Sequence, residues 1–379
     1  MIPYGHQTID QKDIKSVLDV LKSDWLTQGP KVLEFEKALA KYCGAKYAVC
    51  VCNGTAALHL AYLAAGIKKG DEIITTPNTF VATANMLLAI GAKPVFAEIR
   101  LDTYNLDENQ IEKLINKKTK AIAPIHFAGQ PSDLAKIKKI AKKYRLLVIE
   151  DACHALGAKY QGSKIGDCRY SDLAVFSFHP VKTMTTGEGG AILTNNKKLY
   201  NRLILSRNHG IYKDKKGKNV MTTFGFNYRL NDLACALGIS QLKKINQIIA
   251  KKRQIVGWYQ QELKNIKEII LPKELKDNYS SWHLYVVLVN KRYRDALAKF
   301  LKKQGIGVNF HYPAVYRHPY YQKLGLGKIN LKNAEFYDKM TLTLPVPPQL
   351  TKKQVKYIVK QIKFFLAMYD NSRSGKTIF

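Results

Sequence analysis

Hydrophobic positions between residues 45 and 195 form short β-rich runs, separated by segments in which apolar residues recur at helical spacing. Two of these helical segments are Thr55–Ala65 and Leu134–Tyr144. Alternation of strands and helices predicts a mainly parallel sheet covered by helices on both faces. The pattern therefore predicts an α/β fold with a seven-stranded sheet, whose strands are Tyr47–Cys52, Glu72–Thr76, Pro94–Glu98, Ala121–Phe127, Leu146–Glu150, Leu173–Phe178 and Ala191–Thr194.

The pattern changes after a long helical segment, Asn231–Gln260, which contains a break. We therefore predict two domains, a large one over residues 1–250, which includes the N-terminal segment, and a smaller C-terminal α+β domain over residues 251–379. The polar tail Asp370–Phe379 is expected to fray. The smaller domain is expected to contain a strand at His283–Val289, a helix at Arg292–Gln304, a Pro-rich stretch at Tyr312–Pro319 and a last helix from Lys352 to about Tyr369.

The charge of the chain is unusual, because 61 Lys and Arg residues against 29 Asp and Glu residues give a formal net charge of +32. Such an excess raises the question of a nucleic-acid partner. Only 11 of the 61 basic residues are Arg, and the lysines are dispersed as pairs on helices, so we interpret most of them as a solvated face. No apolar run approaches the roughly eighteen residues of a membrane span, and Met1–Gln7 lacks a secretory pattern. We therefore expect a cytoplasmic protein without a membrane partner.

The six cysteines show no C-x-x-C pair, and four histidines, His179, His209, His283 and His311, show no metal-ligand spacing. Neither a disulfide framework nor a zinc site is therefore expected. We interpret the cysteines as reduced thiols and these histidines, each taken alone, as packed or capping residues.

Chemically distinctive residues follow three of the predicted strands, at the edge where open α/β sheets bind ligands. Asn53, Gly54 and Thr55 form a small-residue turn before a helix, which suits a phosphate, although a simple N-cap by Thr55 is the alternative. Asp151 ends an apolar run, where a carboxylate is costly unless it has a partner or caps a turn. Lys182 lies in an irregular loop after a buried strand and before three glycines, which allow close backbone approach.

Pyridoxal 5'-phosphate (PLP) is a ligand that needs all three features. It has a phosphate to anchor, a ring nitrogen that an Asp keeps protonated, and an aldehyde that forms a Schiff base with a lysine. Ser177, at a strand end, could donate a further hydrogen bond to the phosphate, and Phe80 could stack on the ring. The sequence therefore predicts a PLP site in which Asp151 and Lys182 are the catalytic residues.

Five segments together resemble the DegT/StrS family of sugar aminotransferases, in the correct order over nearly the whole chain. The resemblance implies the fold of a fold-type I aminotransferase, assembled as a homodimer with shared active sites. The segments are Asn53–Ala56, Glu150–Ala158, Phe176–Lys182, Gly187–Gly190 and Gly225–Arg229.

The same resemblance implies roles for single residues. Lys182 carries the cofactor and shuttles a proton, and Asp151 pairs with the pyridine nitrogen. Asn227 reaches the phosphate from the neighbouring subunit, which makes the dimer obligatory. Within one chain, the resemblance implies that Thr55, Ala56 and Ser177 hold the phosphate and that His154 lies beside the ring.

Within the family, the segments 26–30, 178–190 and 280–285 are most similar to the branch that serves pseudaminic acid biosynthesis. This implies that an amino group moves from L-glutamate, through pyridoxamine 5'-phosphate, to the C4 ketone of UDP-2-acetamido-2,6-dideoxy-β-L-arabino-hex-4-ulose. The product is UDP-4-amino-4,6-dideoxy-N-acetyl-β-L-altrosamine. Lys182 weighs against the dehydrating branch, whose members carry His there. The residues implied to hold the nucleotide-sugar are Tyr4, Asp24, Trp25, Leu26, Thr27, Arg229, His311 and Tyr312.

Three alternatives remain open at this point. The substrate is alternatively another nucleotide-linked keto-sugar, because periodicity and spacing distinguish neither UDP from dTDP nor a C4 from a C3 ketone. A nucleic-acid-binding protein is the alternative that the charge suggests, although no recognition motif accompanies the lysines. A catalytically silent scaffold is disfavoured by the intact Lys182 and Asp151.

Overall fold

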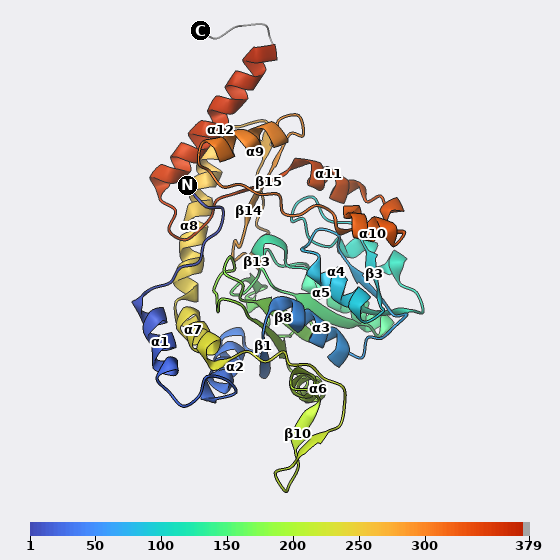
Figure 1. The fold of residues 1–379 in the computed structure, drawn as a ribbon. Helices are drawn as coiled ribbons and strands as arrows, with labels where there is room; N and C mark the ends of the chain where they lie inside the picture. The colour runs from blue at the N-terminus through green and yellow to red at the C-terminus, as the bar shows by residue number, and fades with distance from the viewer. Residues whose placement is uncertain (374–379) are drawn as a thin grey trace.

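The computed structural model describes residues 1–373 and contains the expected seven-stranded sheet, in the order β1-β9-β8-β5-β4-β2-β3 (Figure 1). β9 pairs antiparallel with both β1 and β8, whereas the other pairs are parallel. The predicted mainly parallel α/β sheet is therefore confirmed. Its strands are β1 (Tyr47–Val51), β2 (Glu72–Thr75), β3 (Lys93–Phe96), β4 (Thr119–Ile122), β5 (Leu147–Asp151), β8 (Leu173–Ser177) and β9 (Gly190–Thr194).

Both faces of this sheet are apolar and covered by helices. Along β5, Ile149 packs into the cluster that holds helix α3 (Gly54–Ala64), whereas Val148 packs with helix α5 (Leu134–Tyr144) on the other face. Successive side chains of a strand point to opposite faces, so a strand buried on both sides is continuously apolar. The other covering helices are α4 (Ala82–Ala89) and α6 (Lys197–Arg207) on the α3 face, and α2 (Pro30–Cys43) and α7 (Asp232–Lys243) on the opposite face.

Parallel pairing places the ends of neighbouring strands together. Asp151 of β5 lies opposite Val175 of β8, so Ser177 lies one short step beyond Asp151 at the same edge. The first turn of α3 follows the end of β1 at this edge. The sheet therefore brings together the strand ends that carry the candidate chemistry.

A second core lies against a three-stranded sheet, β12 (Ile269–Ile270), β14 (Tyr285–Val289) and β15 (Thr341–Leu344). The break expected in the long helix is confirmed at Lys244, between α7 and α8 (Ile245–Leu263). The first turns of α8 pack into the large core and its later turns into the second core. The predicted domain boundary at residue 250 thus falls within one helix and stays a prediction. The expected C-terminal helices are α9 (Arg294–Lys303) and α12 (Lys352–Arg373).

The last helix is longer than predicted, because α12 includes the first residues of the segment that was expected to fray. Residues 374–379 lie outside the described part of the chain. No helix of residues 1–373 is long and apolar enough to cross a membrane. The other elements are α1 (Gln11–Leu21), β6 (Lys159–Tyr160), β7 (Ser163–Lys164), β10 (Ile211–Lys213), β11 (Asn219–Met221), β13 (Asn278–Tyr279), α10 (Pro319–Lys323), α11 (Lys332–Met340) and the 3-10 helices η1 (Glu108–Gln110), η2 (Glu112–Leu114), η3 (Phe127–Gly129), η4 (Val315–Arg317) and η5 (Leu326–Lys328).

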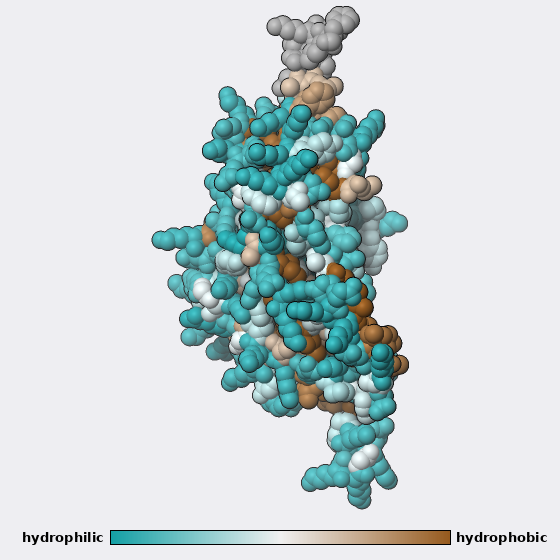
Figure 2. Space-filling view, turned by 90° about the vertical axis from the view of Figure 1, so that its left-hand side faces the viewer, coloured by the Kyte–Doolittle hydropathy of each residue, from teal (hydrophilic) through white to brown (hydrophobic). Residues whose placement is uncertain are grey.

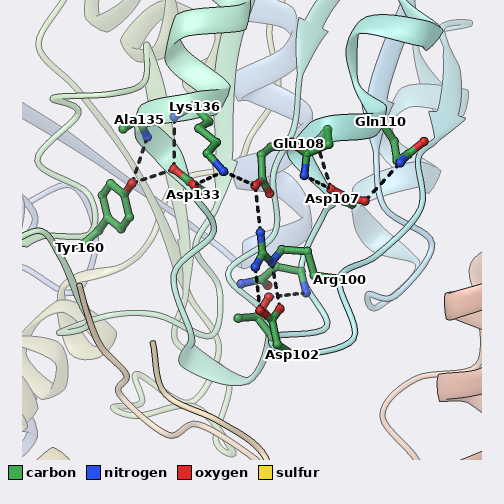
Figure 3. Close-up of polar contacts among 12 residues, drawn as sticks. Arg100, Asp102, Asp107, Glu108, Gln110, Asp133, Ala135, Lys136 and Tyr160 are labelled. Atoms are coloured by element: carbon green, nitrogen blue, oxygen red, sulfur yellow. Dashed lines mark hydrogen bonds and ion pairs between the residues drawn. The ribbon is translucent and has the colours of Figure 1, made fainter. Parts of the chain in front are cut away.

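A polar network joins the long connection after β3 to helix α5 (Figure 3). Glu108 Oε1 accepts from Arg100 Nη1 at 2.9 Å and from Lys136 Nζ at 3.0 Å. The Tyr160 hydroxyl donates to Asp133, the N-cap of α5, at 2.8 Å. Glu108 is buried, so its two cations offset the cost of removing a carboxylate from water. The network therefore stabilises a side of the large domain that lies outside the cavity described below.

Most side chains on the face that Figure 2 shows are hydrophilic, and the hydrophobic ones form separate groups between them. Several large apolar side chains of α1 and the segment after it are nevertheless exposed, including Leu21 at 55% and Trp25 at 56%. The β10–β11 hairpin projects from the body of the molecule (Figure 1).

Candidate active site

A cavity of about 780 Å³ opens at the carboxyl edge of the central sheet. Its walls come from the segments after β1, β2, β5 and β8 and, on the other side, from residues 283–284 and 309–313. Ligands of open α/β sheets bind at this edge. The sequence-predicted residues that line the cavity are Tyr4, Thr55, Phe80, Asp151, His154, Ser177, Lys182, His311 and Tyr312.

The start of α3 forms a small cradle in this cavity. Asn53, rather than Thr55, caps the helix, because the Asn53 side chain accepts a hydrogen bond from Ala56 N at 2.8 Å. The alternative of an N-cap by Thr55 is therefore wrong, and Thr55 lines the cavity instead. A Cβ on Gly54 would lie 2.8 Å from Ser177 Cβ, so only glycine lets Ser177 come this close to the helix. Helix N-termini with adjacent hydroxyls suit phosphate groups.

Asp151 is a buried carboxylate at the end of β5, and two neutral groups hold it. Thr83 Oγ1 donates to Asp151 Oδ2 at 2.6 Å, and Cys153 N donates to Oδ1 at 3.1 Å. Among the ion pairs of the described residues, none includes Asp151. A carboxylate fixed in this way is available to a protonated ring nitrogen in the cavity. Sequence reasoning missed Thr83, whose only signal was its position in the Thr79–Thr83 segment that also holds Phe80.

Lys182 is half-buried in the loop between β8 and β9. Burial lowers the pKa of its amine below the usual value of 10.5, although the acidic side chains of Cys153 and Asp151 oppose this shift. A lower pKa leaves more of the amine unprotonated at neutral pH, and the unprotonated amine is the form that attacks an aldehyde. The environment of Lys182 therefore suits the predicted role.

His154 follows Asp151 in the cavity wall, and its hydrogen bonds define its tautomer. Nδ1 lies 3.3 Å from Ala128 N, which can only donate, so Nδ1 is the unprotonated nitrogen. Nε2 then carries the hydrogen and donates to Tyr312 Oη at 3.3 Å. Burial, followed by the charge of Lys182, holds the pKa of His154 well below its usual value. His154 is therefore a neutral donor at neutral pH.

His311 completes the opposite wall, where its ring lies 5.4 Å from the ring of Tyr4. Asn309 Oδ1 accepts from Phe310 N, so the Asn309 amide nitrogen is the group that faces His311 Nε2 at 3.4 Å. Nδ1 therefore carries the hydrogen and donates to Thr343 Oγ1 at 2.8 Å. Burial lowers the pKa of His311 to about 4. This wall offers neutral hydrogen-bonding groups rather than charge.

Several predicted residues do not line the cavity of their own chain. Ala56 is buried with its N–H bonded to Asn53. Asn227 is exposed, and Arg229 Nη1 donates to Asn208 Oδ1 at 2.6 Å. Their assigned roles stay predictions, and so do those of the exposed residues Asp24, Trp25, Leu26 and Thr27.

Other cavity residues escaped sequence reasoning. His283, which we interpreted as a packed histidine, is indeed buried, but its ring lies 4.4 Å from that of His154 and it lines the cavity. Its signal was its place in the segment 280–285. The remaining ones include Thr79, Thr83, Cys153, His179, Glu188, Asn309 and His318, which mostly flank predicted residues.

These residues fit PLP as a group. The α3 cradle suits the phosphate, the Asp151 carboxylate suits the ring nitrogen, and the Lys182 amine suits the aldehyde. Phe80 offers an exposed aromatic face within the same cavity. No cluster of potential metal ligands occurs among residues 1–373.

This fold and this cavity define a PLP-type aminotransferase. The DegT/DnrJ/EryC1/StrS aminotransferase family model matches residues 7–363, and the chain belongs to this family. The resemblance stated from the sequence is therefore confirmed. The chain is a sugar aminotransferase of a PLP-dependent family.

Individual relatives cover nearly the whole chain. The UDP-4-amino-4,6-dideoxy-N-acetyl-beta-L-altrosamine transaminase of Campylobacter jejuni is 43% identical over 364 residues, which are 94% of this chain and 96% of that protein. The solved structure of Helicobacter pylori PseC, an aminotransferase of pseudoaminic acid biosynthesis, has a TM-score of 0.92 at 36% identity and covers 97% of this chain and 99% of its own. The solved PMP form of the putative sugar aminotransferase Spr1654 of Streptococcus pneumoniae has a TM-score of 0.92 at 28% identity and covers 96% of this chain and 99% of its own.

Proposed function

We propose that this aminotransferase binds PLP in the cavity and moves an amino group from L-glutamate to the C4 ketone of UDP-2-acetamido-2,6-dideoxy-β-L-arabino-hex-4-ulose. The product would be UDP-4-amino-4,6-dideoxy-N-acetyl-β-L-altrosamine, for the pseudaminic acid pathway. The convergence of Lys182, Asp151 and the α3 cradle on one cavity carries the proposal for the cofactor. For the substrate, the support is a relative of that name at 43% identity.

Four of the residues that line the cavity have a task in this reaction. PLP, when bound, supplies an aldehyde and an electron-withdrawing ring. Thr83 and Cys153 donate hydrogen bonds to the Asp151 carboxylate and hold it in place for the ring nitrogen. The amine of Lys182 takes a proton from the carbon of the amino donor and delivers one to the carbon of the sugar.

The charge distribution of the cavity fits the sugar portion of a nucleotide-sugar. Lys182 is the sole Lys or Arg among the lining residues of the described chain. His154 and His311 are held neutral, so this wall offers hydrogen bonds to hydroxyl, carbonyl and acetamido groups. The diphosphate and the carboxylates of glutamate need cations from elsewhere, and we propose Arg229 as one of them.

We further propose a homodimer in which Asn227 and Arg229 complete the cavity of the other subunit. Both residues lie outside their own cavity, and exposed apolar side chains such as Trp25 and Leu26 are available for a contact between subunits. A cytoplasmic location is proposed on the six cysteines, all of which are free thiols.

An amino-transfer assay with glutamate and a panel of keto-sugars tests the proposal. The UDP-linked N-acetylated 4-keto sugar should turn over with formation of 2-oxoglutarate, and the purified protein should be yellow. Lys182→Ala should abolish both, whereas Lys198→Ala, an exposed lysine on α6, should change neither. A colourless wild type that stays inactive with added PLP contradicts the proposal for the cofactor.

The panel also tests the alternative substrate. If the UDP-linked sugar is inert while a dTDP-linked or 3-keto sugar turns over, the substrate assignment is wrong and the family assignment stands. Steep, salt-sensitive binding of DNA would support the nucleic-acid alternative, whereas weak binding at low salt would not.

A further inference from the structure

Lys252 of α8 is a buried lysine that the reaction described above does not use. Its side chain is 4% exposed, and Nζ lies 3.2 Å from the carbonyl oxygen of His283 and 3.5 Å from that of Trp282. None of the ion pairs found in residues 1–373 includes Lys252. Burying an ammonium without a carboxylate is costly, and a methionine would fill similar space without that cost. The two carbonyl contacts are therefore the feature that the lysine adds.

The segment that Lys252 holds is itself strained. Trp282 has a φ of +48°, in the left-handed region that bulky residues avoid. Such a conformation persists when the surroundings over-determine it. The carbonyl of this residue is one of the two that face the Lys252 ammonium. Lys252 thus stabilises the backbone at the point where it is least favourable.

The same segment holds His154 in the cavity wall through two contacts. Ser281 Oγ donates to the carbonyl oxygen of His154 at 2.9 Å. The ring of His283 packs on the ring of His154 with centroids 4.4 Å apart. His283 Nδ1 is buried without a hydrogen-bond partner, so no bond at this nitrogen orients the ring. The position of the His283 ring therefore depends largely on the backbone at residues 282–283.

We propose that Lys252 is a positioning residue of the active site, whose ammonium fixes the Trp282–His283 backbone and thereby the ring of His154 in the cavity wall. The contact pathway runs from α8 through this segment to His154, which faces the ligand. Its effect on catalysis rests on the proposed PLP-dependent amino transfer, whereas its effect on the histidine rings does not.

The charge of Lys252 reaches the same histidines. The titratable groups that face it are His283, His154 from the loop after β5 and, across a small cavity of about 10 Å³, Lys182 and His6. No carboxylate lines that small cavity. Burial is the main cause of the low pKa of both imidazoles, and the positive charge of Lys252 lowers it further. Removing this charge should therefore raise both pKa values.

Three variants separate the position from the charge. Lys252→Met removes both the hydrogen bonds and the charge, whereas Lys252→Gln keeps a donor for one carbonyl without the charge. Lys251→Met is the matched control, because Lys251 is the exposed neighbour on the same helix. Histidine titrations are followed by NMR in the PLP-free protein with labelled histidine, and assigned with His154→Gln and His283→Phe. Kinetics are measured in the PLP-loaded enzyme.

We expect Lys252→Met to lower kcat by about 10- to 100-fold, with KM for the keto-sugar changed less than about twofold, since displaced catalytic groups cost rate. Both histidine titrations should move to higher pH. Lys252→Gln should recover part of kcat but keep the shifted titrations.

The proposal is overturned if Lys252→Met matches Lys251→Met in kcat and in both titrations, or if its loss of activity only follows a loss of folded protein. If Lys252→Met does not fold, unshifted titrations in Lys252→Gln overturn it equally. A wild type that binds no PLP would refute the proposed function, yet the titrations would still test Lys252.

Discussion

At the scale of single residues, Asp151 depends on a hydroxyl that lies far away in the sequence. Thr83 donates to Asp151 across a separation of 68 residues, at 2.6 Å and out of contact with water. Hydrogen bonds to a charged group are among the stronger ones, and a buried carboxylate that loses one becomes harder to keep ionised. The affinity for PLP should therefore depend on Thr83.

We predict that Thr83→Val weakens PLP binding by about 10- to 100-fold, the equivalent of one hydrogen bond to a charged group. Equilibrium titration of the PLP-free protein, followed by the visible absorbance of the bound cofactor, measures the effect. Thr75→Val is the matched control, because Thr75 is also buried but donates to the carbonyl oxygen of Ala123. Equal PLP affinities in the two variants would contradict this role of Thr83.

The residues that the sequence pattern marks, and that line one cavity in the structure, follow the ends of strands. Asp151 and Lys182 follow continuous apolar runs, and the direction of a parallel sheet brings such ends to one edge. Thr83 and His283 carry no such mark, because their contacts with Asp151 and His154 arise only when separate elements pack. The pattern of apolar runs therefore indicates Asp151 and Lys182, but it does not indicate the residues that contact and position the site.

At the scale of elements, the start of α3 is built around the absence of one side chain. A Cβ at Gly54 would meet Ser177 Cβ at 2.8 Å and Oγ at 3.1 Å. Extra atoms in such a contact displace the neighbouring backbone at a cost of about 1–3 kcal/mol. This substitution would displace the N-terminus of α3 and the Ser177 hydroxyl, which are proposed to hold the phosphate.

We predict that Gly54→Ala lowers the free energy of unfolding of the PLP-free protein by about 1–3 kcal/mol and also weakens PLP binding. Urea unfolding and PLP titration measure the two effects. Gly257→Ala in α8 is the control, because a Cβ there meets nothing within 4 Å. It should raise stability by about 0.5–1 kcal/mol and leave PLP binding unchanged. A Gly54→Ala protein with wild-type affinity would show that the cradle does not hold the phosphate.

Helix α8 gives a prediction for the pH dependence of stability. Burial lowers the pKa of Lys252 from 10.5 to about 8, so between these values the unfolded chain binds the proton that the folded chain has released. The free energy of unfolding of the wild type should therefore rise with pH in this window, relative to Lys252→Met. The relative gain should approach about 3 kcal/mol by pH 10.5.

Urea unfolding of both proteins from pH 7 to pH 10.5 provides this comparison. Buried tyrosines and cysteines with raised pKa values also affect stability at high pH, but they are present in both proteins and largely cancel in the difference. A difference that does not vary with pH would mean that Lys252 titrates normally in the folded protein.

Periodicity predicted the existence of the elements better than their directions. Six of the seven strands were predicted within two residues at each end, because a strand buried on both faces leaves a continuous apolar run. The prediction for β4 was wrong at its end, because the mostly apolar run continues to Phe127 whereas the strand ends at Ile122. That β9 lies between β8 and β1 and runs antiparallel to both could not be read from its apolar residues. Strand direction depends on how the connecting loop crosses the sheet, and the residues 178–189 show no helical period that would mark a crossover.

At the scale of the whole molecule, the cavity unites segments from the entire chain. Tyr4, Thr55, Lys182 and His311 all line it, although more than 300 residues separate the first from the last. The pattern of apolar residues does not predict that these four residues line one cavity. The family resemblance did imply that they belong to one site. The large positive charge of the chain contributes little to this cavity, since among the described residues a single lysine lines it. The surplus therefore lies outside the chemical site.

The shared active site of the proposed homodimer gives the final prediction, which uses two inactive variants. Lys182→Ala damages the cavity of its own chain, and Asn227→Asp places a carboxylate where the partner's phosphate is proposed to bind. In a hybrid dimer, one active site then contains both substitutions and the other contains neither. If subunits exchange freely in an equal mixture, about half of the dimers are hybrids, and about a quarter of wild-type activity should return.

Lys182→Ala mixed with Asp151→Ala is the control, because both side chains line the cavity of the same chain. Each active site of that hybrid contains one of the two substitutions, so no activity should return. Native mass spectrometry of tagged subunits measures the hybrid fraction in each mixture, which makes the two experiments directly comparable. Recovery in both mixtures, or in neither despite the formation of hybrids, would contradict a site completed by Asn227 of the other subunit. The exposed position of Asn227 would then need an explanation within a single chain, where it lines no part of the cavity.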